Sequence, residues 1–550
     1  CCITSDMYLP RATIDQMLRK LDIPDTVPLY LSSEMGVTKK TGNLFRRILS
    51  DTNLSASQIL HVGDNISTDV RSAEGVSIRP FHVPKAVEYL RSNRHYAKNI
   101  GKRQPIDNIG RSVVISNIAR RVFDDPRNAF RESVTNGSTF NLGYAAVGPI
   151  LLGYVLWLRS RAQAKNIDHL FFLSREGRLI KDAFDIVEEV SPIGIKGTYL
   201  LCSRRTAQIA AIRTTTDIVE VALNPLGNDV DVATALENRF GIDSIHATSE
   251  RLKAAGFETT SDFAGGRNQN KFIRLVQELS DVIIETAASE RSAYEKYLEG
   301  MGFLAANRPA VVDIGWKANM QGALGKIRGS ALTGFYLATL DAARRWTSVG
   351  HDVEAYHSNF CITTLHSGLV SHRLFIEHFW CDSSPSLERF CLDDEGRASP
   401  VFKPVARRGI RLESSQEIHK AALALVEDIG HKMPEFFRNY ELEATFADRF
   451  LEQFVSGPTK RDASIFTSRA FEDVFGGVSE GAIIACSSER VDVAGSYWKP
   501  GARAVSGGGN AEDDPTLDGQ RRADSAKHAG RLTIIRRRLI LGITGPFVRP

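Results

Sequence analysis

The stretch QILHVGDNISTD (Gln58–Asp69) decides the fold class of the first part of the chain. A short apolar run ends at Gly63, and a polar turn with two aspartates, Asp64 and Asp69, follows it at once. Open parallel sheets place their ligand-binding residues where strands end, and a glycine permits a tight turn before the acidic pair. The stretch therefore predicts a strand whose carboxyl end carries a functional loop.

Strand-like and helical patterns alternate on the amino-terminal side of that stretch. The apolar runs CCIT (1–4) and VPLYL (27–31) precede it, and the helical patterns RATIDQMLRKL (11–21) and TGNLFRRIL (41–49) lie between the runs. Such alternation is typical of a parallel α/β sheet. Residues 1–100 are thus predicted to form an α/β unit.

Polar residues also follow the two earlier apolar runs. Ser5 ends the first run, and Lys39 lies in the segment SSEMGVTKKTG that follows the second. A hydroxyl, a compact ammonium and two carboxylates are the groups that hold a phosphate and a hard cation such as Mg²⁺. Each residue alone also fits an ordinary cap or turn. The order of the three segments favours a joint site made of Ser5, Lys39, Asp64 and Asp69.

These segments resemble three motifs of the haloacid-dehalogenase-like (HAD) hydrolases. TSDMYLP is similar to the second family motif, SSEMGVTKKTG to the third and HVGDNISTDV to the fourth, and the resemblance covers roughly residues 1–90. It implies that Ser5 and Lys39 are catalytic residues that contact phosphate, and that Asp64 and Asp69 face Mg²⁺. The function it implies is a Mg²⁺-dependent phosphohydrolase (a phosphatase) acting on a small phosphorylated metabolite.

One family motif has no counterpart in the expected place. The first motif, D-x-D, supplies the nucleophilic aspartate and should precede Ser5 by several tens of residues, whereas this sequence begins at Cys1. Asp229-Val-Asp231 follows the other motifs and comes after a loop-like segment. We therefore expect this chain to lack the nucleophile and the complete protein to carry it. The alternative is a non-catalytic binding or scaffold protein of glycan assembly with a degenerate HAD unit.

Residues 126–345 repeat the alternation of apolar runs and helical patterns and predict a second α/β domain. Polar clusters follow three of its apolar runs and contain Arg175, then Arg204 with Arg205, then Asp313 with Trp316. If these strands are parallel neighbours, the clusters form a phosphate or anion site in one crevice. The same residues also fit helix caps and internal ion pairs, and both interpretations remain open.

The segments FFLSREG, SRRT and VVDIGW in this region also carry a resemblance. They are similar to a domain that accompanies HAD units in large bacterial proteins, often alongside glycosyltransferases in surface-polysaccharide clusters. The resemblance implies a sugar phosphate or nucleotide sugar as ligand and a glycosyltransferase as partner.

The rest of the chain is less regular. We predict a linker at 101–125, a helical insertion near 217–290, a helix-rich region at 346–495 and a disordered basic tail at 496–550. The fold class is therefore α/β, with an incomplete HAD-type Rossmann-like parallel sheet, a second α/β domain and a helix-rich carboxyl-terminal region.

Composition restricts the partners and the compartment. Lys plus Arg minus Asp plus Glu is 69 − 65 = +4, too small an excess in 550 residues to indicate nucleic acid. Leu142–Leu158 is apolar, but it contains three glycines and a proline and falls short of the ~20 residues of a membrane span. We predict a buried helix there and no integral membrane segment. Seven cysteines without a C-x-x-C pair favour the cytoplasm.

Overall fold

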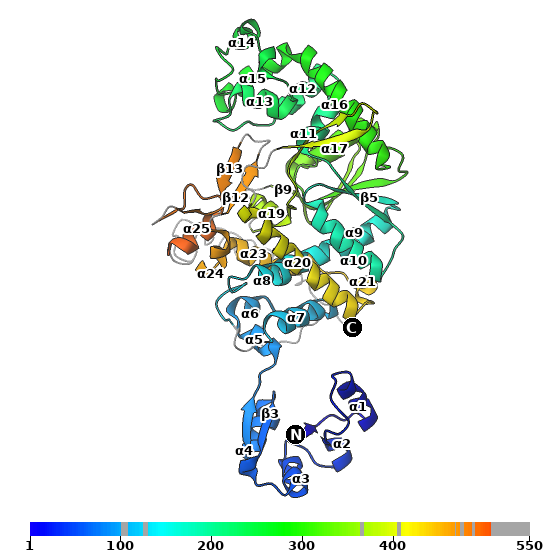
Figure 1. Ribbon diagram of the computed structural model, residues 1–550, viewed down its shortest axis with the longest axis vertical. Coiled ribbons are helices and arrows are strands. Elements are labelled where there is room, and N and C mark those ends of the chain that lie inside the picture. Colours follow the sequence, from blue (N-terminus) through cyan, green and yellow to red (C-terminus); the bar gives the residue numbers. More distant parts are fainter. Residues whose placement is uncertain are drawn as a thin grey trace, which may run out of the picture. The chain divides into compact units, whose positions relative to one another are not determined.

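The computed structural model describes residues 1–100, 108–124, 130–362, 368–403, 409–467, 469–473, 478–486 and 490–507. The chain divides into two compact units, one formed by residues 1–93 with 119–130 and the other by residues 94–118 with 131–550. Both units combine helices with parallel strands (Figure 1), which confirms the predicted α/β class.

The first unit holds two pairs of parallel strands instead of one continuous sheet. Strand β1 (Ile3–Ser5) pairs with β2 (Leu29–Leu31), and β3 (Leu60–Gly63) pairs with β4 (Arg79–His82). Its helices are α1 (Arg11–Arg19), α2 (Ser32–Met35), α3 (Asn43–Thr52), α4 (Ser72–Glu74) and α5 (Ala86–Ser92). The strand–helix alternation matches the sequence pattern, and the polar segments follow β1, β2 and β3 as predicted.

A small apolar core supports β3 and the turn after it. Helix α3 is amphipathic and buries Phe45 and Ile48, which pack with Ala73 and Ile78. The opposite face of the β3–β4 pair is open, since Leu60, Val62 and Phe81 are each more than half exposed. Parallel strands are normally covered on both faces. This pair is therefore an incomplete layer.

The second unit is built on a five-stranded parallel sheet. Its strands are β5 (His169–Leu173), β6 (Lys196–Leu200), β7 (Pro309–Asp313), β8 (Thr333–Leu340) and β9 (Asp352–Cys361), in the spatial order β6-β5-β7-β8-β9. Strand β9 lies beyond the boundary predicted at residue 345, because only part of this edge strand is buried and its apolar pattern is weak. The strand order reverses between β5 and β7, which is the position where such sheets bind ligands.

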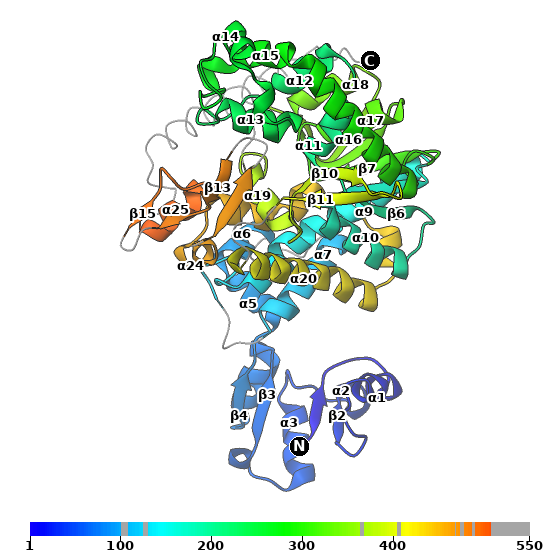
Figure 2. The same cartoon turned by 45° about the horizontal axis from the view of Figure 1, so that its top comes forward.

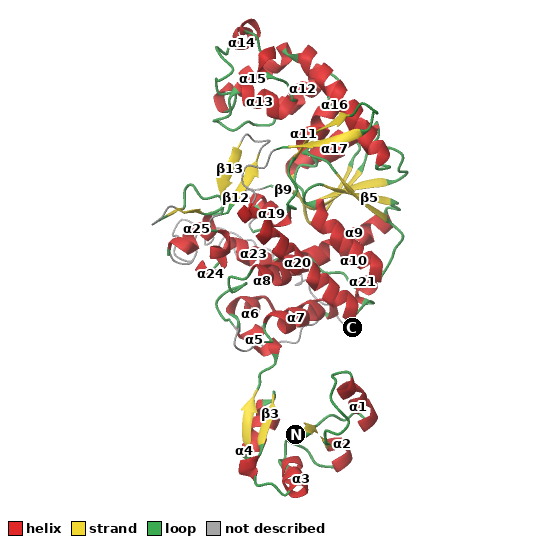
Figure 3. Ribbon diagram, viewed as in Figure 1, coloured by secondary structure: helices red, strands yellow, loops and turns green. Residues whose placement is uncertain are grey.

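Helices cover both faces of this sheet (Figures 1 and 3). On one face Phe172 contacts Phe184 of α10 (Gly177–Val190), and Phe335 contacts Trp157 of α9 (Gly148–Ala164). The other face packs against α11 (Arg204–Ala210), α16 (Ser280–Gly300) and α17 (Asn319–Arg328). Burial on both faces explains why the central strand β5 is apolar at almost every position.

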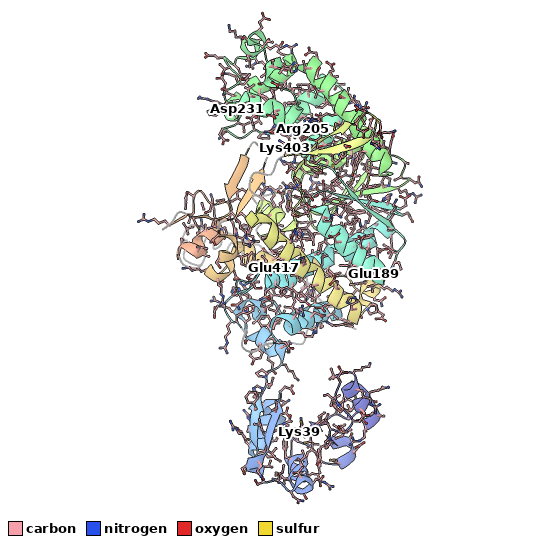
Figure 4. All side chains as sticks on the ribbon, in the orientation of Figure 1. Lys39, Glu189, Arg205, Asp231, Lys403 and Glu417 are labelled. Carbon is pink, nitrogen blue, oxygen red and sulfur yellow. The ribbon has the colours of Figure 1, made fainter. Side chains whose placement is uncertain are left out.

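The predicted insertion near 217–290 is helical and has its own apolar core. It contains α12 (Thr215–Ala222), α13 (Val232–Phe240), α14 (Ser249–Ala255), α15 (Gln269–Glu278) and the first half of α16. Asp231, labelled in Figure 4, accepts a hydrogen bond from the Thr234 backbone at 2.7 Å and caps α13. The second aspartate of the Asp229–Asp231 pattern is thus a helix cap.

The apolar stretch at 142–158 is buried inside the second unit. One helical segment in the described residues, Thr139–Ala164, is long and apolar enough for a membrane span, and 89% of its most apolar window is buried. A Cβ at Gly143 would lie 2.3 Å from the Ile418 carbonyl oxygen of α20 (Gly409–Lys432), so this glycine permits the close approach of two helices. The predicted buried helix is confirmed.

Two predicted irregular segments contain helices. Helix α7 (Ile109–Val122) occupies most of the predicted linker, because Val114, Ile115 and Ile118 form a buried face. Helix α25 (Lys499–Ser506) occupies the start of the predicted tail, of which residues 508–550 lie outside the described residues. The remaining elements are α6 (Arg94–Ile100), α8 (Thr139–Asn141), α18 (Arg344–Thr347), α19 (Arg373–Trp380), β10 (Leu387–Leu392), β11 (Ala398–Phe402), α21 (Phe436–Asn439), α22 (Ala444–Ala447), α23 (Arg449–Ser456), α24 (Lys460–Ala463), β12 (Ala470–Asp473), β13 (Val478–Ala482), β14 (Ala485–Cys486) and β15 (Val491–Asp492).

Candidate functional site

Asp69 is the centre of a buried polar cluster in the first unit. Its side chain is 3% exposed, and Lys39 Nζ lies 2.6 Å from its Oδ1. His61 Nε2 lies 3.0 Å from the same oxygen, and the Asn65 backbone N–H donates to Oδ2 at 2.9 Å. Lys39, labelled in Figure 4, comes from the segment after β2, whereas Asp69 follows β3. The structure therefore brings together two of the four residues predicted for the first site.

The environment of Asp69 keeps its carboxylate ionised. Burial alone would raise its pKa, but the hydrogen bonds from Lys39, the Asn65 backbone and His61 outweigh burial and lower the pKa to about 2. Gly63 makes room for this side chain, since a Cβ at that position would lie 2.4 Å from the Asp69 Cβ. At neutral pH the carboxylate thus fixes the ammonium group of Lys39.

Asp6 joins the end of β1 to the same cluster. Its Oδ1 and Oδ2 accept the Lys39 backbone N–H at 2.9 and 3.2 Å. The neighbouring Ser5 hydroxyl oxygen accepts the Met7 backbone N–H at 3.2 Å. Sequence reasoning missed Asp6, although it directly follows the strand-like run CCIT and the predicted Ser5. The strand-end segments after β1, β2 and β3 are therefore connected through Lys39.

Asp64 differs from Asp69 in its exposure. Its side chain is 43% exposed, and its Oδ2 lies 2.8 Å from Nζ of Lys85, which is 60% exposed. Surface pairs of this kind are weak, so Asp64 is able to exchange this partner for a cation. Both oxygens of Asp69, in contrast, already accept hydrogen bonds. Proteins often hold Mg²⁺ through one or two carboxylates, with water and phosphate oxygens as the other ligands.

Of the two aspartates expected to face Mg²⁺, Asp64 has an exposed carboxylate, whereas Asp69 is engaged by Lys39, His61 and the Asn65 backbone. Within the described ranges no group of three or more His, Cys, Asp and Glu side chains is arranged to hold a metal ion.

A second polar cluster lies at the carboxyl ends of β5, β6 and β7. The Ser174 hydroxyl donates to the Cys202 carbonyl and accepts the Cys202 backbone N–H, both at 3.0 Å. These bonds tie the segment after β5 to the segment after β6. Because β5 and β7 are parallel neighbours, the segment with Asp313 ends at the same edge of the sheet. The expected convergence of the three strand ends is therefore present.

Carboxylates dominate this strand-end cluster. Asp313 is 3% exposed, and its pKa is raised well above the ordinary value by burial and by the charges of Glu176 and Glu377, against a lowering effect of Arg204. Cys381 donates to Glu176 Oε1 at 2.8 Å, and burial together with Glu176 raises the pKa of this thiol. Within this cluster, the environment of Asp313 and of Cys381 therefore favours their neutral forms.

Sequence reasoning did not assign Glu176, Glu377 or Cys381 to a site. Glu377 belongs to α19 and Cys381 directly follows that helix, so both are far from β5 in the chain and no local pattern connects them with it. Glu176 is adjacent to the predicted Arg175 in the sequence. Its position between a buried strand and a helix was the sequence feature that could have indicated a functional residue.

Two predicted residues of this region are engaged inside the protein. Arg205, labelled in Figure 4, donates to both carboxylate oxygens of Glu290 at 3.0 and 2.9 Å and to the Glu388 carbonyl, and it is 7% exposed. Trp316 is also 7% exposed, and its Nε1 donates to Glu377 Oε1 at 2.5 Å. The charge of Arg205 is thus compensated, and the Trp316 ring is packed inside the protein.

The two other predicted arginines interact electrostatically with the strand-end cluster. Arg204 lowers the pKa of Asp313 and Arg175 lowers that of Cys381, so each lies close enough to interact with a group of the cluster. The Arg175 backbone N–H also donates to Glu176 Oε2 at 3.0 Å. This edge of the sheet therefore combines acids with cations.

A scan against protein-family models and a search of curated proteins found no match to this chain.

Proposed function

We propose that the first unit supplies the phosphate- and Mg²⁺-binding part of a HAD-type phosphohydrolase that acts on a small phosphorylated metabolite. The single observation that carries the proposal is the buried contact of 2.6 Å between Lys39 Nζ and Asp69 Oδ1. It joins the segment that follows β2 to the segment that follows β3, and parallel α/β units bind ligands at such strand ends. The resemblance of all three strand-end segments to HAD motifs supports the same assignment.

Each residue then has a defined task. Lys39 neutralises phosphoryl oxygens as a compact positive charge, and Asp69 keeps it in position. The Ser5 hydroxyl donates a hydrogen bond to the phosphate, and the exposed carboxylate of Asp64 holds the cation. Mg²⁺, when bound, neutralises charge on the phosphoryl oxygens. We assign no nucleophile among these residues, so hydrolysis belongs to a protein in which this site meets the aspartate that the resemblance implies.

A second candidate function is phosphate binding without hydrolysis, in a scaffold protein of glycan assembly. The observation that favours it is the complete engagement of Asp69, whose oxygens accept bonds from Lys39, His61 and Asn65. The carboxylate of Asp69 is thus fully paired without a ligand. In both versions we propose a cytoplasmic protein with a sugar phosphate as ligand and a glycosyltransferase as partner. The seven free cysteines agree with a reducing compartment.

The two functions are separated by hydrolysis of p-nitrophenyl phosphate with and without Mg²⁺, measured on the protein purified from its natural source and on the chain 1–550. The phosphohydrolase predicts Mg²⁺-dependent hydrolysis by the native protein, lost in an Asp64→Asn variant and kept in Asp51→Asn, whose aspartate pairs with Arg47 on the surface. Hydrolysis by neither sample contradicts the enzyme and supports the binding role.

A further inference from the structure

We propose that the second unit contains a nucleophilic serine, Ser358, which accepts a small acyl group from a carboxylic ester and passes it to water. Ser358 lies in β9, the edge strand of the five-stranded sheet, close to the carboxyl end of that strand. Its hydroxyl group takes part in a series of hydrogen bonds with His357 and Asp448. These residues belong neither to the Asp69 cluster nor to the strand-end cluster, so the proposal does not rest on the proposed function.

The hydrogen bonds give Ser358 a base, and they give the base a carboxylate. Ser358 Oγ lies 2.8 Å from His357 Nδ1, and His357 Nε2 lies 2.6 Å from Asp448 Oδ2. An ionised carboxylate only accepts hydrogen bonds, so the neutral imidazole carries its proton on Nε2 and uses Nδ1 to accept the hydroxyl proton. Ser-His-Asp hydrolases activate their serine with the same three groups, although the two imidazole nitrogens exchange roles here.

Cys361 fixes the orientation of the serine hydroxyl. Its thiol donates to Ser358 Oγ at 2.9 Å, which leaves the hydroxyl proton directed at His357. Cys361 is 1% exposed, so its sulfur does not meet a substrate. Ser358 is partly exposed, and the next residue, Asn359, is exposed. The reactive atom of the group is therefore Ser358 Oγ.

The backbone of β9 brings His357 and Ser358 together. Successive side chains of a regular strand point to opposite faces of the sheet. Three steps along β9 correspond to two steps along β8 between Ala355 and Ser358, and again between Ser358 and Cys361. Such bulges are uncommon in parallel pairs, redirect side chains and occur often beside active sites. Phe360 also has a positive φ of 56°, an uncommon conformation for a bulky residue and one that is found at functional sites.

The carboxylate of the site comes from a distant part of the chain. Asp448 is buried and directly precedes α23. Figures 1 and 2 show α19, α24 and α25, which also follow β9 in the chain, gathered on one side of the second unit. Burial and the charge of Asp448 raise the pKa of Glu452 in α23, against a lowering effect of His357. Glu452 thus favours its neutral form, and Asp448 is the charged partner of the imidazole.

The arrangement supports ester hydrolysis in two steps. Ser358 Oγ attacks the ester carbonyl carbon while His357 Nδ1 accepts its proton, and the bond to the alcohol oxygen breaks as His357 returns that proton to the departing alcohol. Water then attacks the acyl-serine, His357 again transfers the proton, and the products are a carboxylic acid and free Ser358. Ala338 and Cys361 are buried beside the partly exposed serine, so only a small acyl group fits.

The test combines covalent labelling with an ester assay on the chain 1–550. Diisopropyl fluorophosphate reacts with activated serines, and we expect mass spectrometry to find it on Ser358. We also expect hydrolysis of p-nitrophenyl acetate without Mg²⁺, reduced at least about 100-fold in Ser358→Ala and in His357→Gln because the nucleophile or its general base is lost. The controls Ser348→Ala and His246→Gln change exposed residues and keep the wild-type rate.

Asp448→Asn separates a positioning role from a merely structural one. Asparagine has the same size but does not stabilise the imidazolium, so kcat should fall at least about tenfold while KM stays unchanged. Tryptophan fluorescence checks that each variant is folded, and His357→Gln serves if Ser358→Ala is not. The proposal is overturned if wild type takes up no label at Ser358, if ester hydrolysis survives the serine and histidine substitutions, or if Asp448→Asn leaves kcat unchanged.

Discussion

Replacing Asp69 by asparagine tests the structural basis of the Lys39 site. The pKa of Asp69 is about 2 in the folded protein, against 3.8 for an unperturbed aspartate. At about 1.4 kcal/mol per pKa unit, this difference contributes about 2.5 kcal/mol to the folding free energy at neutral pH. Because the folded-state pKa is the lower one, the contribution is complete above the unfolded value and is lost as the pH falls from about 4 to about 2. Asp69→Asn removes it at all pH values.

The assay must report on the first unit alone. All five tryptophans lie in the second unit, at positions 157, 316, 346, 380 and 498, so fluorescence does not follow the first. Amide hydrogen exchange of peptides covering residues 58–70 reports on the first unit, because it measures local opening of the backbone there. A loss of about 2.5 kcal/mol corresponds to roughly 70-fold faster exchange at pH 7.

The difference between the variant and wild type should largely disappear near pH 2, where about half of Asp69 in the wild type is protonated and most of its contribution is lost. The control is Asp25→Asn, which breaks the exposed pair with Arg19 and should leave exchange unchanged. Equal protection of Asp69→Asn and wild type at pH 7, or a difference that persists unchanged near pH 2, would refute the assigned ionisation of Asp69.

Three further predictions concern the second unit. Gly143→Ala places a methyl group against the α20 backbone and should lower the unfolding free energy by about 1–3 kcal/mol in tryptophan-monitored unfolding, whereas Gly300→Ala meets open space and should be neutral. Asp313→Asn should be more stable than wild type by an amount that grows as the pH rises from 4 to 7. The raised folded-state pKa of Asp313 makes ionisation increasingly costly over that range, and thermal melts at each pH measure the effect. Iodoacetamide at pH 8 should modify the exposed Cys391 and spare the buried Cys381. Mass spectrometry of the labelled native protein measures both sites. Rapid labelling of Cys381 would contradict its burial.

The parallel sheet of the second unit was predictable because its strands are continuous apolar runs. His169–Leu173 and Pro309–Asp313 are buried at every position, and such runs followed by a polar turn and an amphipathic helix have few other interpretations. The convergence of the polar clusters then follows from parallel pairing. The helix inside the predicted linker was not foreseen for a related reason, since the basic composition of that segment concealed the buried apolar face of α7.

The partners of the polar residues were not predictable in the same way. Arg205 opens a helix after a strand, which is also how an anion-binding arginine is placed, and only the folded chain shows its pair with Glu290 in α16. Glu377 reaches Trp316 from α19, another element distant in the chain. Local sequence thus locates the edge of the sheet where polar groups gather, whereas long-range packing decides which charges are compensated there.

The measurement that tests the central claim most directly is calorimetric titration of the chain 1–550 with inorganic phosphate in the presence of MgCl₂. It compares wild type with Lys39→Met and with Lys40→Met, which removes the exposed neighbouring lysine. The Lys39 site predicts that phosphate binds to wild type and to Lys40→Met with similar affinity, and at least tenfold more weakly to Lys39→Met. Equal affinity of all three proteins, or no binding by wild type, would contradict the assignment of a phosphate site to the first unit.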